Sequence, residues 1–349
     1  HECAQLVELG LTAVKVMPVA QTQWRFNWGY DGVHFYAVRN SYGEPDDFKA
    51  FIDACHGLGL AVLLDVVYNH VGPEGNYLAE FGPYCSTKHH TPWGDALNYD
   101  GPGSEHVRQF IVDNARYWIE EFHLDGLRLD AVHFMYDERP NTILDELRQA
   151  IAQVETKVGR PIHLIAEANV YDPELLASRP DRPAYDAIWC DCLMHSIYAH
   201  VLPDLRLTNR LYRGGRELAE VLSQGRLFAG RKQERVASDA SIDGQRRSVD
   251  AVVESFVVAL QTHDAVGNHP LGKRFHQLAS PGAQRAAAAL TLLYPGIPLI
   301  FMGEETAADA PFPFFAEFED PRLRRAVDRG RAKEFPQHRW GEIGSPSAW

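Results

Sequence analysis

Residues 126–133 read Gly126-Leu127-Arg128-Leu129-Asp130-Ala131-Val132-His133. This run predicts a short buried strand that ends in polar residues. Three other β-rich runs end in the same way. They are Ala61–Val67, which contains Asp65 and leads into Asn69 and His70, Ile162–Ala166, which is followed by Glu167, and Phe256–Gln261, which is followed by His263 and Asp264. Because active sites of α/β barrels form at the carboxyl ends of their strands, these four strand ends are the candidate active site.

The rest of the chain alternates between β-rich runs and helical patterns, which is typical of a parallel sheet with crossover helices. The other predicted strands are Ala13–Val19, the weaker Phe35–Val38, Ala187–Cys190 and Pro298–Met302. The predicted helices are Pro45–Leu58, Ser104–Phe122 with Ser104 as its cap, Thr142–Val158 and Gln284–Leu293. Eight strands alternating with helices favour one α/β domain, a (β/α)₈ TIM barrel, and alternation alone leaves a doubly wound sheet open.

Residues 71–103 are rich in Gly, Pro, Tyr and His and are long for a connection between a strand and a helix. We expect them to form a short lid insertion after the third strand. The barrel then comprises residues 1–70 and 104–320, and residues 321–349 form a C-terminal extension. Because residue 1 is a histidine, we expect the chain to be a segment of a longer polypeptide.

Composition limits the classes of partner. The 349 residues include 34 Lys and Arg against 47 Asp and Glu, which gives a net charge of −13 and argues against nucleic acid or an anionic membrane. No apolar run approaches the roughly 20 residues that cross a bilayer. The five cysteines lack the spacing of a zinc site, so we expect reduced, packed thiols and a cytoplasmic protein, including at Cys190 and Cys192. The oligomeric state stays open.

The acidic strand ends predict a reaction only as a set. Alone, Asp130 could cap a helix, Glu167 could be an ion-pair partner and Asp264 could form a turn. Together they fit retaining glycoside cleavage, in which two carboxylates about 5 Å apart act as nucleophile and as acid and base. Imidazoles and Arg128 would supply hydrogen-bond donors to the carboxylates and to sugar hydroxyls.

Four segments resemble the short conserved regions of the α-amylase superfamily, in the same order: Asp65–His70, Gly126–Asp130, Ala166–Ala168 and His263–Asp264. The resemblance implies that Asp130 is the nucleophile, Glu167 the acid and Asp264 a transition-state stabiliser. It also implies that Tyr30 stacks on the bound sugar. In the lid, Trp93 is a second aromatic residue that could stack on sugar. The predicted substrate-binding residues are Tyr30, Asp65, His70, Trp93, Arg128, His133 and His263.

Finer similarity is to the maltooligosyltrehalose trehalohydrolases, in Asn69–Leu78, His90–Asn98, Asp264–Asn268 and Phe301–Glu305. This resemblance implies an α-glucan oligosaccharide substrate, cleavage of the α-1,4 bond next to a terminal trehalose, and flanking β-domains that are largely absent here. The segment Trp189–His195 departs from that family's pattern. Branching enzymes and other amylase-type enzymes are the alternatives, and a non-catalytic carbohydrate-binding protein is disfavoured because all three carboxylates are present. We expect no cofactor and no metal, because the lid lacks a recognisable set of calcium ligands around Asn69.

Overall fold

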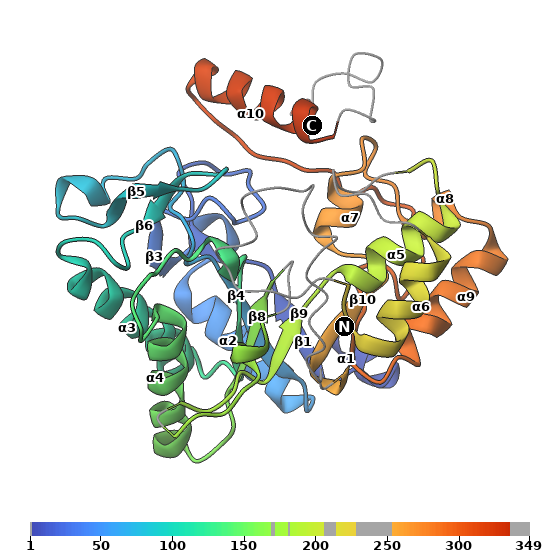
Figure 1. Cartoon of the computed structure of the whole chain (residues 1–349), viewed down its shortest axis with the longest axis horizontal. Coiled ribbons are helices and arrows are strands. Elements are labelled where there is room, and N and C mark those ends of the chain that lie inside the picture. Colours follow the sequence, from blue (N-terminus) through green and yellow to red (C-terminus); the bar gives the residue numbers. More distant parts are fainter. Residues whose placement is uncertain (1, 169–171, 181, 206–213, 228–252, 336–349) are drawn as a thin grey trace. The chain divides into compact units, whose positions relative to one another are not determined.

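The computed structural model describes residues 2–168, 172–180, 182–205, 214–227 and 253–335 (Figure 1). The chain divides into two compact units. Unit 1 comprises residues 1–167 and 175–186, and unit 2 comprises residues 168–174 and 187–349. Among the helices that the structure describes, none is both long enough and apolar enough to cross a bilayer.

Unit 1 is built on four parallel strands. They lie in the order β1 (Ala13–Val16), β4 (Ala61–Val66), β7 (Gly126–Leu129) and β8 (His163–Glu167). Helix α1 (Glu2–Glu8) precedes β1, and a longer helix precedes each of the other three strands. These helices are α2 (Pro45–Gly57), α3 (Ser104–Phe122) and α4 (Ile143–Val158), and α3 packs against both of the others (Figure 1). The predicted alternation of strand and helix is therefore confirmed in this unit.

The prediction that Phe35–Val38 is a strand of the main sheet is wrong. The strand exists, as β3 (His34–Val38), but it pairs antiparallel with β2 (Ala20–Gln21) in a separate two-stranded sheet. Strand β4 lies directly beside β1 instead. A parallel partner for β1 needs a crossover, usually a helix, and residues 22–33 contain none, whereas a hairpin needs only a turn.

The first residues of helices α4 and α3 can be compared with the helix starts predicted from the sequence. The predicted helix Thr142–Val158 is confirmed as α4, with Thr142 as its cap instead of its first residue, because the Thr142 side chain accepts the backbone N–H of Asp145 in a capping box. Ser104 was predicted to cap α3, but it is the first helical residue and Gly103 is the cap. The Ser104 hydroxyl is buried and accepts a hydrogen bond from Arg139 at 2.7 Å, so it is engaged by the loop before α4.

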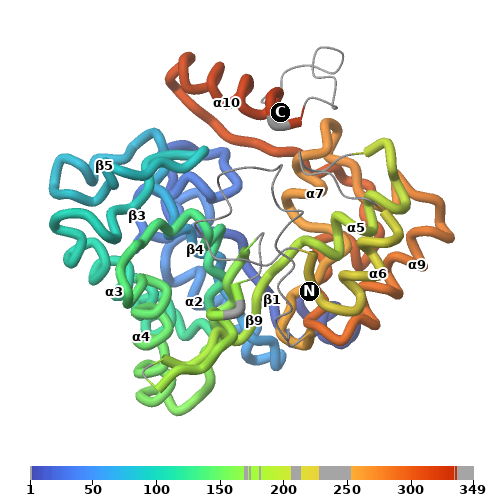
Figure 2. Tube along the Cα trace, in the orientation of Figure 1, coloured from blue at the N-terminus to red at the C-terminus, as the bar shows by residue number. Residues whose placement is uncertain are grey.

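The lid, residues 71–103, folds as a small antiparallel hairpin of β5 (Cys85–His90) and β6 (Asp95–Leu97), preceded by the short helix η2 (Leu78–Glu80). In Figure 2 the lid follows β4 and ends where α3 begins. A bridge between His70 and Ala96 fixes its base. A Cβ at Gly94 would lie 2.3 Å from the carbonyl oxygen of Val71, so only glycine permits this close approach.

Unit 2 contains three parallel strands in the order β9 (Ala187–Trp189), β10 (Phe256–Ala259) and β11 (Ile297–Leu299). Its helices are α5 (Cys192–Val201), α6 (Gly215–Gln224), α7 (His263–Gly267), α8 (Phe275–Leu278), α9 (Pro281–Leu292) and α10 (Pro321–Glu334). Helix α9 starts three residues earlier than predicted, because Ser280 caps it. Helix α10 begins the predicted extension, of which residues 336–349 lie outside the described residues.

The thiols at Cys190 and Cys192 flank the end of β9 and the start of α5. Both side chains are buried, and their Sγ atoms lie 3.2 Å apart as free thiols. Burial and the neighbouring sulfur raise the pKa of Cys190 well above its ordinary value, so it stays a neutral thiol. This agrees with the prediction that the pair packs in the core.

Candidate active site

The register of the unit 1 sheet places the predicted acids side by side. Arg128 lies on β7 and Asp130 directly follows that strand's last residue, so the two, which are two residues apart, extend to the same side. Arg128 pairs with Asp65 on β4, while Leu129 pairs with Ala166 on β8. Glu167 therefore ends its strand at the level of Asp130.

Arg128 connects three carboxylates. Its Nη1 donates to Asp65 Oδ1 and to Asp130 Oδ1, each at 2.7 Å, and its Nη2 lies 3.2 Å from Glu167 Oε2. Its side chain is buried. Burial acts to lower the pKa of the guanidinium, but the three acids together raise it well above its ordinary value. Arg128 is therefore a fixed positive charge at the centre of the site.

Asp130 receives a donor on each carboxylate oxygen. Arg128 binds Oδ1, and the side-chain amide of Asn69 donates to Oδ2 at 2.8 Å and to the backbone carbonyl at 2.9 Å. The pKa of Asp130 is raised to about 7, chiefly by burial and also by the charges of Glu167 and Asp65, while Arg128 and Asn69 act against the shift. The same carboxylate is thus held in place and titrates near neutral pH.

Glu167 is positioned by the main chain as well as by Arg128. The backbone N–H of Ala131 donates to Glu167 Oε2 at 2.6 Å. Ala131 has a φ of 41°, a left-handed conformation that is uncommon for a residue with a Cβ. The turn directly after Asp130 is therefore strained, and it aims a backbone donor at the neighbouring acid.

Asp65 belongs to the interior of the site. Its Oδ2 accepts Lys15 Nζ at 2.6 Å and the hydroxyl of Tyr30 at 2.8 Å, and its Oδ1 accepts Arg128. Its side chain has no exposed surface. The structure thus places Asp65 as an anchor for other site residues, where the sequence analysis expected it to touch substrate.

Lys15 is a site residue that the sequence analysis missed. It lies on β1, and burial lowers its pKa while the charge of Asp65 raises it. With Arg128 it supplies two positive charges among the three acids. A lysine within the apolar run Ala13–Val19 was the available signal, because a buried lysine is paired in nearly every folded protein.

Imidazole and aromatic rings border this network. His70 is buried, its Nδ1 is hydrogen-bonded to Asn69 Oδ1, and burial lowers its pKa to about 4, so it is neutral. The Trp93 ring lies 5.7 Å from the His70 ring and 4.9 Å from Phe134, and Phe134 lies 4.5 Å from His133. Trp93 remains 46% exposed. Three of the predicted substrate-binding residues therefore share one partly exposed row.

Unit 2 carries the remaining predicted residues. Thr262 caps α7 by accepting the N–H of Ala265, which places His263 and Asp264 in the first turn. Asp264 is 48% exposed at its side chain, and its Oδ2 lies 3.6 Å from Nε2 of the buried His263. In the same unit, burial raises the pKa of Glu304 to about 7. Its carboxylate accepts the N–H of Phe301, which gives it an internal partner.

The structure therefore groups the predicted residues within each unit. In unit 1 it brings together Tyr30, Asp65, Arg128, Asp130 and Glu167, with His70, Trp93 and His133 in the bordering row. It adds Lys15, the amide of Asn69 and the N–H of Ala131, for which sequence reasoning assigned no role.

Comparison with known proteins agrees with this arrangement. Residues 4–95 match the α-amylase catalytic domain. The malto-oligosyltrehalose trehalohydrolase of Arthrobacter ramosus is 42% identical over 96% of this chain and 58% of its own length. That of Saccharolobus solfataricus is 41% identical over 94% of this chain and 57% of its own length. By these matches the chain is similar to enzymes of the α-amylase family over nearly its whole length.

A solved structure of a proposed α-amylase from Salmonella typhimurium has the same fold as this chain. It is 38% identical, has a TM-score of 0.86, and is matched over 99% of this chain and 59% of the Salmonella chain. The predicted fold class is thereby confirmed. The chain spans somewhat more than half the length of each of these relatives.

Proposed function

We propose that this chain is the catalytic part of a retaining glycoside hydrolase that cleaves α-1,4-glucosidic bonds and releases trehalose from maltooligosyltrehalose. The trehalose specificity is supported by the relatives named malto-oligosyltrehalose trehalohydrolase, which match nearly the whole chain. The retaining chemistry is supported by one observation in unit 1, the sharing of Arg128 between Asp130 and Glu167.

That sharing limits how far apart the two acids can be. Asp130 and Glu167 bind the two terminal nitrogens of one guanidinium, at 2.7 and 3.2 Å, so their carboxyl groups are neighbours that share one positive charge. Retaining enzymes hold their two acids about 5–5.5 Å apart, whereas inverting enzymes leave about 6.5–9.5 Å for a water molecule. We assign the retaining class to this pair, and the anomer that forms first tests the assignment.

In the first step of the proposed reaction, the Asp130 carboxylate attacks the anomeric carbon, the glycosidic bond breaks, and Glu167 gives its proton to the leaving oxygen. Ala131 and Arg128 both engage Oε2 of Glu167, so the proton is carried by Oε1. In the second step, Glu167 takes a proton from water as the water breaks the glycosyl ester, and Asp130 is released.

Other residues are assigned to substrate in this proposal. Trp93 is exposed enough to stack on a sugar ring, and the neutral His70 ring donates from Nδ1 to Asn69, which leaves Nε2 to accept from a sugar hydroxyl. In unit 2, Asp264 is half exposed at the start of α7 and is assigned to sugar hydroxyls, with His263 beside it. Tyr30 donates to Asp65, and its ring is assigned to stacking.

The experiment is a comparison of products from maltooligosyltrehalose, a maltooligosaccharide of equal length and amylose, each incubated separately with the protein. We expect free trehalose from the first substrate and little turnover of the second. New α-1,6 branches would favour a branching enzyme, and random shortening of amylose a general amylase. Proton NMR of the fresh maltooligosaccharide product should show the α anomer first, and a β anomer would contradict retention.

A further inference from the structure

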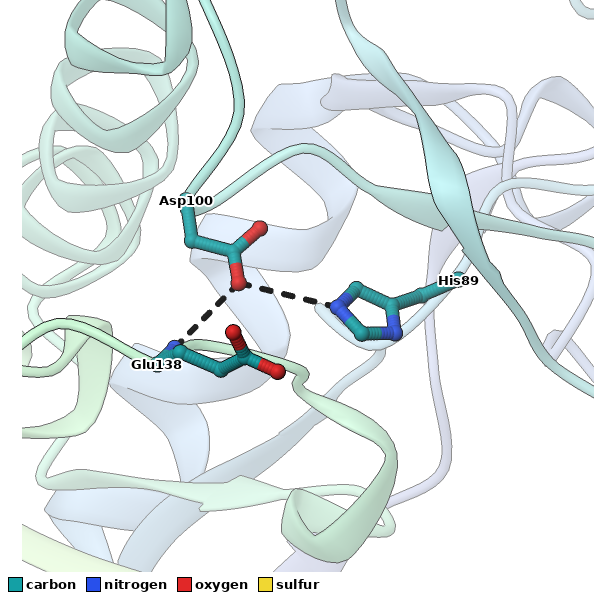
Figure 3. Close-up of side chains that lie close together, drawn as sticks. All are labelled: His89, Asp100 and Glu138. Carbon is teal, nitrogen blue, oxygen red and sulfur yellow. Dashed lines mark hydrogen bonds and ion pairs between the residues drawn. The ribbon is translucent and has the colours of Figure 1, made fainter.

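A second cluster of chemically capable side chains lies in unit 1, away from the acids of β7 and β8. His89 is on β5 in the lid, Asp100 is in the loop between β6 and α3, and Glu138 is in the loop before α4. Figure 3 shows the three side chains converging from their separate segments. One potential ligand atom from each residue lies within 4.8 Å of the others.

The distance between His89 and Asp100 fits two ligands of one ion better than a direct bond. His89 Nε2 lies 3.6 Å from Asp100 Oδ2, which is too long for a hydrogen bond. Two ligands at about 2.0–2.1 Å from a tetrahedral ion are roughly 3.3 Å apart. His89 Nε2 is also buried, and no residue that the structure describes supplies it with a hydrogen-bond partner.

The imidazole is held in this orientation. The His89 ring stacks on the ring of Tyr136, with centroids 4.6 Å apart and planes inclined by 14°. Asp100 is also constrained, because its side chain is only 8% exposed and its Oδ2 accepts the backbone N–H of Glu138 at 3.3 Å. Two of the three ligands are therefore in place before any ion binds, which lowers the entropy lost on binding.

Glu138 and its neighbour Lys88 set the charge of the cluster. Lys88 Nζ pairs with Oε2 of Glu138 on the exposed side, and the carboxylate has a second oxygen to offer. The two carboxylates and the one ammonium sum to one negative charge, which favours a cation. Lys88 also competes with the cation for Glu138, so its removal should strengthen binding.

We propose that His89, Asp100 and Glu138 bind a divalent transition-metal cation of the zinc class, with water completing the coordination. One imidazole nitrogen and two carboxylate oxygens match the ligands of Zn²⁺, whereas Ca²⁺ and Mg²⁺ prefer oxygen alone. The sequence analysis expected no metal, because it searched for calcium ligands around Asn69 and these three residues are widely separated in the chain. The bound ion joins the lid hairpin to the loop that follows β7.

The test is calorimetric titration of the chelator-treated full chain with ZnCl₂, compared with CaCl₂ and MgCl₂. We expect one saturable zinc ion per chain and a rise in melting temperature of about 2–4 °C at saturating zinc, without a comparable effect of calcium or magnesium. Failure to bind zinc saturably would overturn the proposal. These measurements do not involve turnover, so they stand or fall separately from the proposed function.

Matched variants locate the ion. His89→Ala and Glu138→Gln should each weaken zinc binding by about tenfold or more. His90→Ala, at the 73% exposed neighbouring histidine on the same strand, should bind zinc like the wild type. Lys88→Gln should bind zinc more tightly, an outcome that loss of folding cannot imitate. Equal binding by His89→Ala and the wild type, or weaker binding by Lys88→Gln, would show that the ion is held elsewhere.

Discussion

Asn69 donates its side-chain amide to both the carboxylate and the backbone carbonyl of Asp130, at 2.8 and 2.9 Å. This double contact fixes the position of the proposed nucleophile relative to the end of β4. It also stabilises the ionised carboxylate, because the amide hydrogen bonds to the charged form. Arg128 acts on the other oxygen, so Asp130 is oriented from both sides.

The first prediction concerns the nucleophile itself. Asp130→Asn should lower the rate of trehalose release by on the order of 10³-fold or more while the protein stays folded, because an amide cannot form the glycosyl ester. Circular dichroism and the melting curve check the fold. Asp113→Asn, at an acid on the outer helix α3 whose carboxylate bonds to Gln109, is the matched control and should keep full activity. Substantial turnover by purified Asp130→Asn would remove Asp130 from the mechanism.

The second prediction concerns pH. Burial raises the pKa of Asp130 to about 7, and attack requires the ionised form. We expect kcat/KM to rise with pH up to about 7 and to fall by about tenfold per unit well below it. Asn69→Ala removes a bond to the charged form, so the acidic limb should move to higher pH by roughly one unit. If the acidic limb of the kcat/KM profile stays in place in Asn69→Ala, that limb reports the titration of a different group.

The third prediction concerns Lys15 as a positioning residue. Lys15→Met removes one charged hydrogen bond from Asp65, which keeps Arg128 and Tyr30, so it should destabilise the fold by about 1.5–3 kcal/mol. It should also shift the acidic limb of kcat/KM to higher pH, since the remaining acids lose a neutralising charge. Lys15→Arg keeps the charge and should keep the limb where the wild type has it. A purely structural lysine would change the melting temperature and leave the limb in place.

The fourth prediction concerns Trp93. Trp93→Ala should weaken binding or transition-state positioning by about 1–3 kcal/mol, measured as a fall in kcat/KM for the long substrate. Its edge contact with Phe134 is worth about 0.5–1.5 kcal/mol, so the melting temperature should fall only slightly. Phe81→Ala removes another lid ring, 81% exposed, and is the control. Equal kinetic losses in both variants would attribute the effect to the lid in general.

Much of unit 1's site could be predicted because it depends on strand ends. The runs Gly126–Asp130 and Ile162–Glu167 each end in an acid, and parallel strands meet at their carboxyl ends, so neighbouring acids follow from the pattern. The role of Lys15 could not be predicted in that way. Its partner depends on the register in which Ala13–Val16 pairs with Ala61–Leu64, and that register is fixed by tertiary packing.

Two local signals were insufficient for a similar reason. Phe35–Val38 has the composition of a buried strand, yet composition does not specify which strand it pairs with, and here the connection of residues 22–33 contains no helix to carry a parallel crossover. Ser104 has the chemistry of a helix cap, but a tertiary contact with Arg139 occupies its hydroxyl. The left-handed turn at Ala131 carried no sequence signal, because alanine is not typical of that conformation.

Three acids depend on Arg128, so one substitution at residue 128 would remove a partner from each of them. Lysine would keep one charge there but could not present two separate nitrogens to Asp130 and Glu167. The backbone N–H of Ala131, by contrast, persists with every residue type except proline. In a lineage that diverges under selection for turnover, position 131 can therefore accept other small residues that tolerate a left-handed φ and keep its donor, while position 128 cannot change without disturbing Asp65, Asp130 and Glu167 at once.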